Sequence, residues 1–207
     1  YGLTITALYF VFSKIEFSSV LRLFGSANIA WLLLALLLFT ASKAVSAIRL
    51  NIFFRKTGLS ISESLNLRLY LLGMFYNLFL PGGIGGDGYK IYLLQKNYTT
   101  GTARLFGAVL TDRLSGMTAL AALALLLFSL GDVPVLYNWA GYLFIPFTFA
   151  GLYLFCRLFY RYFIPAFIRT SLLSLIVQVL QLFSAWAIIL ALGGDEQLLS
   201  YLLVFLV

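Results

Sequence analysis

Four apolar stretches in this chain are each long enough to cross a membrane. They lie at residues 28–48, 105–130, 135–156 and 172–192. A helix needs roughly 20 apolar residues to cross about 30 Å of hydrocarbon. Hydrophobic residues make up 62% of the 207-residue chain and charged residues only 10%, so a soluble globule of this composition could not cover its apolar core. The sequence therefore predicts an all-α, polytopic transmembrane helical bundle.

Two further apolar runs, at residues 1–12 and 198–207, are too short to cross. We therefore expect residues 1–207 to form a single multi-pass transmembrane domain that is a fragment of a longer protein, open at both ends. The opening run has no basic leader and no small-residue cleavage site, so we do not expect a signal peptide.

The sequence has few of the side chains that commonly bind metals or act in catalysis. Cys156 is the one cysteine in the sequence, so no internal disulfide can form, and the sequence contains no histidine. Histidine is the commonest metal ligand and the commonest general base. We therefore expect no metal site, no cofactor and no catalytic residue, and predict that the protein is not an enzyme.

A shorter apolar run at residues 69–80 decides the topology. Twelve residues form a helix of about 18 Å, too short to span. If this run crossed, the basic residues between positions 49 and 68 would lie outside, against the positive-inside rule. A re-entrant helix that ends at Pro81 instead places ten basic residues inside. The alternative is a short, tilted span followed by an ordinary turn.

A glycine-rich loop follows this run. Five glycines between Pro81 and Tyr89 are expected to allow positive φ angles and to leave backbone N–H groups bare. Successive bare N–H groups form an anion-binding concavity. The loop, with Asp87 and Lys90, is therefore a candidate anion site, located within protein or beside a wet cavity at membrane depth.

Asp112 and Arg113 lie about two turns inside the span that begins at residue 105, where ionisable side chains are costly. As neighbours they point about 100° apart on a helix and cannot pair well with each other. The nearest candidate partners of suitable sign are Asp87 and Lys90, and Asp87, Asp112 and Arg113 are expected to form a charge network. Alternatively, Arg113 snorkels to the head groups and Asp112 joins helices.

Polar residues also form a stripe on the span that begins at residue 172. Ser174, Gln178 and Gln181 recur at helical spacing, so they face protein or water rather than lipid. They are candidates to line a polar head-group path, and the alternative is hydrogen bonding between helices. Lys43, near the inner end of the span at 28–48, is expected to snorkel.

The run NLFLPGGIGGDGYK at residues 77–90, followed by TDRLSG at 111–116, resembles the transmembrane region of bacterial lysylphosphatidylglycerol synthases and related flippase-like membrane proteins. That family has an Asn-x-x-x-Pro-x-x-x-Gly-Gly-Asp element before an Asp-Arg-x-x-Gly element. The matching residues are Asn77, Pro81, Gly85, Gly86, Asp87, Asp112, Arg113 and Gly116. Lys90 stands where the family often has arginine, which weakens bidentate phosphate contact. No aminoacyl-transfer domain occurs in these 207 residues, so the resemblance implies lipid translocation rather than lysylation.

These observations predict a flippase-like protein of the bacterial cell (inner) membrane that binds or translocates an anionic phospholipid or a polyprenyl-phosphate-linked lipid. The expected head-group site consists of Asn77, Pro81, Gly82, Gly83, Gly85, Gly86, Asp87 and Lys90. Membrane lipids are the expected partners, nucleic acid is not, and a homodimer stays open. The alternatives are a membrane-embedded enzyme that acts on lipid-linked sugars through Asp87 and Asp112, and a non-transporting envelope scaffold.

Overall fold

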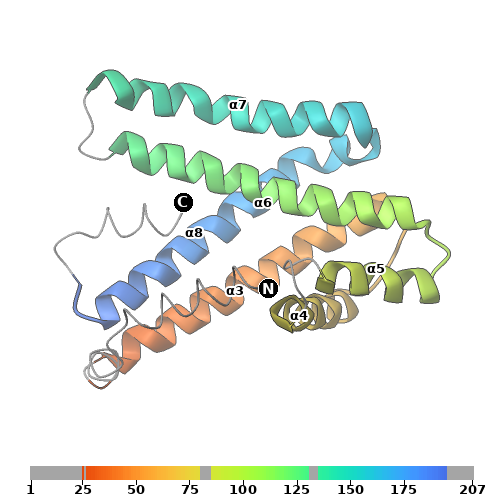
Figure 1. The fold of residues 1–207 in the computed structure, drawn as a ribbon, viewed down its shortest axis with the longest axis horizontal. Coiled ribbons are helices and arrows are strands. Elements are labelled where there is room, and N and C mark those ends of the chain that lie inside the picture. The colour runs from red at the N-terminus through yellow and green to blue at the C-terminus, as the bar shows by residue number, and fades with distance from the viewer. Residues whose placement is uncertain (1–24, 26, 80–84, 131–134, 195–207) are drawn as a thin grey trace, which may run out of the picture.

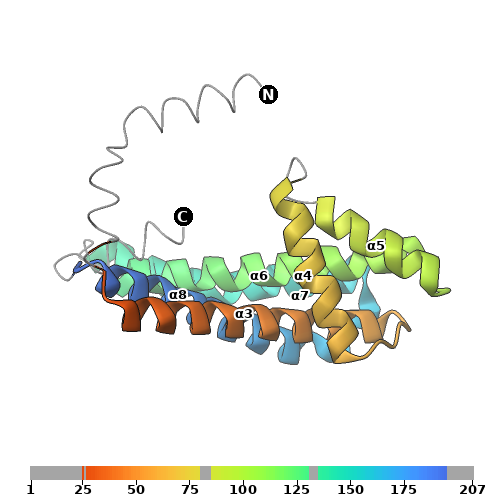
Figure 2. The ribbon, with the colours of Figure 1, turned by 90° about the horizontal axis from the view of Figure 1, so that it is seen from below.

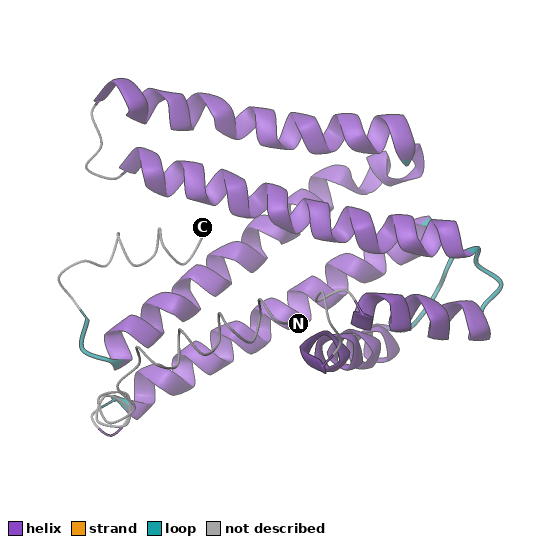
Figure 3. Cartoon of the chain, viewed as in Figure 1, coloured by secondary structure: helices purple, strands orange, loops and turns teal. Residues whose placement is uncertain are grey.

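The computed structural model describes residues 25, 27–79, 85–130 and 135–194, and within these ranges it contains helices and no strand (Figure 3). This confirms the predicted all-α bundle. The elements, labelled in Figure 1, are α3 (Ile29–Lys56), α4 (Glu63–Phe79), α5 (Gly85–Asn97), α6 (Thr102–Leu130), α7 (Val135–Phe159), the 3-10 helix η1 (Arg161–Ala166) and α8 (Phe167–Ala191).

Four helical segments are long and apolar enough to cross a membrane, at Ile29–Lys56, Thr102–Leu130, Gly141–Phe159 and Arg161–Ala191. They correspond to the four predicted spans. α3 differs most from the prediction, because it continues past residue 48 to Lys56. Beyond Arg49 the sequence turns apolar again, and Leu50, Phe53 and Phe54 are buried.

The ends of the long helices fix the topology of the segment between α3 and α6. α3 ends and α6 begins at the same end of the bundle, which we call the inner end because Lys56 and Arg104 lie there (Figure 1). α4 runs crosswise to the long helices, and α5 returns from it toward the inner end (Figure 2). The chain between α3 and α6 therefore leaves and rejoins one end of the bundle, as the re-entrant topology predicts.

The re-entrant helix is longer than predicted, since α4 has 17 residues and begins at Glu63 rather than at residue 69. The hydroxyl of Ser62 accepts a hydrogen bond from the backbone N–H of Leu65 at 3.2 Å, as an N-cap does. Asn66 donates to the carbonyl of Ala47 on α3 at 2.5 Å, and its side chain is fully buried. Polar contacts therefore stabilise the first turn of α4. A prediction based on apolar runs does not include this turn, because its residues are largely polar.

The hydrophobic core lies at the inner end, where all these elements converge. Its buried residues come from α3, the α3–α4 connection, α5, α6, α7 and η1, among them Leu50, Phe53, Leu94, Leu105, Leu152 and Phe163. The rings of Phe53 and Phe163 pack edge to face at 5.1 Å between centroids. The outer halves of the spans expose large apolar side chains instead, such as Leu36 and Leu37. The core thus includes residues of α5 and packs against Leu69 and Tyr70 of α4.

Candidate functional site

A cavity of ≈ 180 Å³ lies where α4 and α5 meet α3 and α6. Its charged lining consists of three cations and two carboxylates: Arg49, Lys90, Arg113, Asp87 and Asp112. Tyr70 and Asn77 of α4 are among the other lining residues. The charged side chains that line the cavity therefore carry one positive charge in surplus.

Asp87 holds two of these cations. Its Oδ1 lies 2.6 Å from the ammonium nitrogen of Lys90, and its Oδ2 accepts a hydrogen bond from Nε of Arg113. The side chains of Lys90 and Asp87 are only 6% and 11% exposed, whereas that of Arg113 is 41% exposed. The predicted contact between Arg113 and Asp87 is present, and the partly exposed guanidinium is the member that a ligand could reach.

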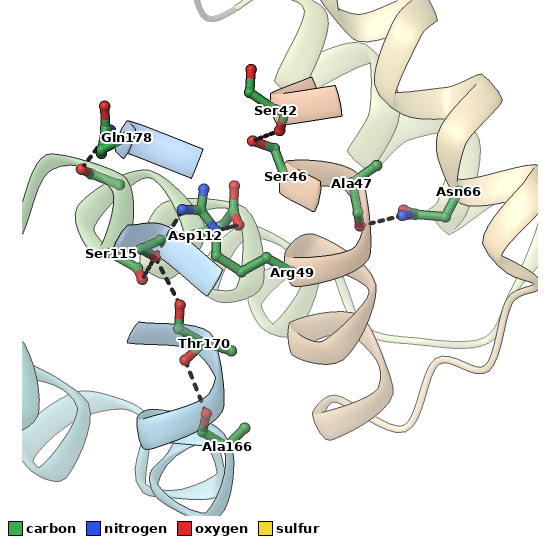
Figure 4. Close-up of polar contacts among 12 residues, drawn as sticks. Ser42, Ser46, Ala47, Arg49, Asn66, Asp112, Ser115, Ala166, Thr170 and Gln178 are labelled. Carbon is green, nitrogen blue, oxygen red and sulfur yellow. Dashed lines mark hydrogen bonds and ion pairs between the residues drawn. The ribbon is translucent and has the colours of Figure 1, made fainter. Parts of the chain in front are cut away.

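Asp112 does not pair with Lys90, the candidate partner that the sequence suggested for it. Instead Nε of Arg49 donates to Oδ1 of Asp112 at 2.7 Å, with both side chains at most 10% exposed (Figure 4). Nη1 of Arg49 also donates to the hydroxyl of Ser174 on α8 at 2.8 Å. Arg49 therefore links α3, α6 and α8 at the wall of the cavity.

The sequence does not mark Arg49 as a site residue, because the first apolar stretch ends at residue 48 and Arg49 falls in the band of cytoplasmic charges that follows. In the structure Arg49 lies seven residues, or about 10 Å, from the end of α3. The apolar residues after Arg49 carried the missing signal. A charge followed by another turn of buried side chains lies inside a helix rather than after it.

The described glycines of the predicted loop have a different role from the one expected. Gly85, Gly86 and Gly88 lie in the first turn of α5, and none of them has a positive φ. The prediction of positive φ is therefore wrong for these three residues, because they are helical. Pro81, Gly82 and Gly83 lie outside the described residues.

Gly86 instead permits a close approach of two backbones. A Cβ on Gly86 would overlap the carbonyl oxygen of Gly73, and one on Gly73 would lie 2.7 Å from Cε of Lys90. The two glycines thus let α4 and α5 cross in backbone contact, with the stem of Lys90 passing over Gly73. This crossing brings the Lys90 ammonium, which is paired with Asp87 of the same helix, to within 5.2 Å of the Tyr70 ring centroid on α4.

The Asn77 side chain occupies part of the anion-binding concavity that the sequence predicted. Its Oδ1 accepts a hydrogen bond from the backbone N–H of Gly86 at 2.8 Å. This amide is therefore not bare, and Asn77 closes the α4–α5 pair. Within the described residues the groups of the cavity best able to hold an anion are the side chains of Lys90 and Arg113, close to the positive end of the α5 dipole.

The polar stripe on α8 mostly joins helices. The hydroxyls of Ser174 and Ser115 lie 2.5 Å apart, and Gln178 donates to the carbonyl of Gly116 at 3.1 Å (Figure 4). Ser174, Gln178 and Gln181 are not among the residues that line the cavity. Hydrogen bonding between helices thus accounts for two of the three, and their role in a head-group path stays a prediction.

Comparison with known proteins agrees with these features. The family described as "Lysylphosphatidylglycerol synthase TM region" matches residues 1–168, which is most of the chain. The chain belongs to this family. The matched residues include both motifs and the whole lining of the cavity.

A curated relative of this chain is a longer protein. A UPF0104 membrane protein of Pyrococcus horikoshii is 26% identical over 129 residues, which is 61% of this chain and 38% of the relative. The chain thus matches well under half of that protein's length. No solved structure matches the chain significantly.

The two motifs of the lysylphosphatidylglycerol synthase transmembrane family meet at the cavity in this member. Asn77 and Gly86 of the first motif join α4 to α5, and Asp87 binds Arg113 of the second motif. Gly116 lies one turn beyond Asp112, and a Cβ there would lie 3.6 Å from Nη2 of Arg49. A side chain larger than alanine at this position would therefore press on the Arg49 guanidinium.

Proposed function

We propose that this protein binds the phosphate of an anionic lipid in the cavity beside Asp87 and moves that lipid between the two leaflets of the membrane. The family relationship supports the coarser statement that this is a membrane protein connected with lipid biology. The finer statement rests on the chemistry of the cavity.

One observation carries the proposal: a single carboxylate, that of Asp87, forms ion pairs with two cations, Lys90 and Arg113. The five charged side chains that line the cavity have one positive charge in excess. Excess charge at membrane depth is costly unless an anion accompanies it. Arginine and lysine are common phosphate-binding residues, and the positive end of the α5 dipole also favours an anion.

The volume of the cavity favours a head-group phosphate over a whole lipid or sugar. Its ≈ 180 Å³ is smaller than the roughly 300–1,000 Å³ of pockets that enclose drug-sized ligands. The phosphate alone would therefore enter, with the acyl or prenyl chains remaining in the bilayer. The polyprenyl-phosphate-linked lipids predicted from the sequence are also candidates, because they too carry a phosphate on an apolar chain.

A transport role has more support than catalysis by the two carboxylates. Asp87 and Asp112 are both held in ion pairs with basic side chains. A general acid or base must form a hydrogen bond with the reacting group, and these carboxylates already bond to basic side chains of the protein. We therefore propose a transporter rather than an enzyme, in the bacterial cell membrane.

The test is a lipid-translocation assay with the purified full-length protein in vesicles. Fluorescent phosphatidylglycerol should cross between leaflets faster than in protein-free vesicles, while a fluorescent diacylglycerol, which lacks phosphate, should show no protein-dependent increase. Equal acceleration of both lipids would contradict phosphate recognition. No acceleration of either would contradict transport, and a lipid-linked sugar converted to product would support the enzymatic alternative.

A further inference from the structure

Lys43 lies in the middle of a membrane-spanning helix. It is 14 residues from Ile29 and 13 from Lys56, the two ends of α3. At 1.5 Å per residue, each end is about 20 Å away, much farther than a lysine side chain can reach. Snorkelling to the inner head groups, which the sequence predicted, is therefore excluded by the length of α3.

The side chain of Lys43 also points away from the inner end. Its ammonium nitrogen lies 4.5 Å from the ring centroid of Phe39, one turn toward the outer end. This is the direction in which helical side chains lean, because the Cα–Cβ bond tilts toward the N-terminus. Lys43 is half-buried. Its charge is thus held at mid-depth, outward of the cavity.

No carboxylate neutralises this charge in the part of the chain that the structure describes. The ion pairs found there, within 4.0 Å, join Arg49, Arg55, Lys90 and Arg113 to acidic partners and do not include Lys43. A cation–π contact with one ring offsets only part of the cost of a lysine at the centre of a bilayer. Ionisable residues retained at such depth usually serve substrate or ion pathways.

The junction between α3 and α8 continues outward from the cavity to this depth. Arg49 on α3 donates to Ser174 on α8, and the two helices are antiparallel (Figure 1). Seven residues farther outward are Ser42 on α3, which is fully buried, and Gln181 on α8, which is partly buried. The hydrogen bonds from the Ser184 hydroxyl to the carbonyl of Ala35 and from the N–H of Asn28 to the carbonyl of Ala191 set the register of the two helices, so Gln181 lies about four residues, or roughly 6 Å, outward of Ser42.

We propose that Lys43 is a second anion-binding position, which receives the lipid phosphate after it leaves Lys90 and Arg113. It lies six residues outward of Arg49, or about 9 Å along α3. This inference rests on the proposed function. The cavity binds the phosphate first, and Lys43 lowers the electrostatic cost of the phosphate at the middle of the membrane.

The test compares the full-length wild-type protein with Lys43→Met, Lys43→Arg and the control Lys56→Met, which changes an exposed lysine at the inner end of the same helix. Affinity is measured for short-chain phosphatidylglycerol in detergent, and translocation of fluorescent phosphatidylglycerol in vesicles. Lys43→Met should bind within about twofold of wild type but translocate roughly tenfold more slowly, as expected for a lost interaction at the barrier. Lys43→Arg should retain more transport than Lys43→Met, and Lys56→Met should match wild type.

Thermal melting of the same proteins separates transport from folding. Lys43→Met removes an uncompensated charge from the bilayer, so its melting temperature should equal or exceed that of wild type. A wild-type translocation rate in Lys43→Met would overturn the inference and leave the proposed function intact. A lower melting temperature together with slow transport would assign Lys43 to the fold and also overturn it. A wild-type protein that neither binds nor translocates the lipid would contradict the proposed function itself.

Discussion

Arg49 and Asp112 form a buried ion pair between α3 and α6, with Nε of Arg49 2.7 Å from Oδ1 of Asp112. The same guanidinium donates to Ser174 of α8. Three of the four spans are therefore joined at the wall of the cavity that Asp87 and Lys90 also line. The position of Asp112 in the second family motif is explained by this contact, since its carboxylate balances a cation deep in the bundle.

Removal of one member of this pair should destabilise the protein strongly. Arg49→Met leaves the Asp112 carboxylate buried without its partner, at a cost of about 3–5 kcal/mol. The double variant Arg49→Met with Asp112→Asn removes both charges and should recover most of the lost stability. Melting of the purified full-length proteins in detergent measures this, and a double variant no more stable than Arg49→Met would show that the two charges are not coupled.

The crossing of α4 and α5 provides a matched pair of glycines for a second prediction. A methyl group at Gly86 would overlap the backbone of Gly73, whereas one at Gly88, two residues later in the same helix, meets nothing within 4 Å. Gly86→Ala should therefore destabilise by about 1–3 kcal/mol, as overpacking does. Gly88→Ala should be neutral or stabilise by up to about 1 kcal/mol, because alanine favours a helix.

The two alanine variants are compared by their melting temperatures and by lipid translocation at equal protein content. Gly86→Ala should also slow transport, because separation of α4 from α5 moves Tyr70 and Asn77 of α4 away from Lys90 and Gly86 and so changes the cavity. Equal melting temperatures for the two variants would mean that the crossing does not depend on Gly86.

The re-entrant topology predicts the accessibility of single cysteines. Lys56, Lys96 and Arg161 are exposed at the inner end. Cysteines at these positions should all react with a membrane-impermeant maleimide from the cytoplasmic side, whereas one at Leu192, just after α8, should react from outside. The native Cys156 is buried and should contribute little background. Reaction of position 96 from outside would contradict the topology.

Length and charge distribution were sufficient to predict the number of spans and the re-entrant segment. Both follow from the bilayer thickness and the positive-inside rule, which act on local composition. The contact between Arg113 and Asp87 was also predictable, because an ionisable side chain inside a span needs a partner and few candidates exist.

The remaining features depend on contacts between distant segments. The partnership of Arg49 with Asp112 requires the depth of Arg49, and this depth follows from packing that extends α3 beyond residue 48. The glycine-rich motif alone predicts a loop. The residue that Gly86 contacts, Gly73, lies thirteen positions earlier and outside the motif, so the helix crossing could not be predicted from it. No local pattern in the sequence indicates which backbone a glycine approaches.

The central claim is that Lys90 and Arg113, bridged by Asp87, bind a lipid phosphate. The most direct measurement is the affinity of the full-length protein in detergent for short-chain phosphatidylglycerol, compared among wild type, Lys90→Gln and the control Lys96→Gln. Lys90 lines the cavity, whereas Lys96 is exposed on the same helix. A hydrogen bond to a charged group contributes about 1.5–3 kcal/mol, so Lys90→Gln should weaken binding by at least about tenfold while Lys96→Gln stays within about twofold of wild type. Equal affinities for all three proteins would contradict the claim.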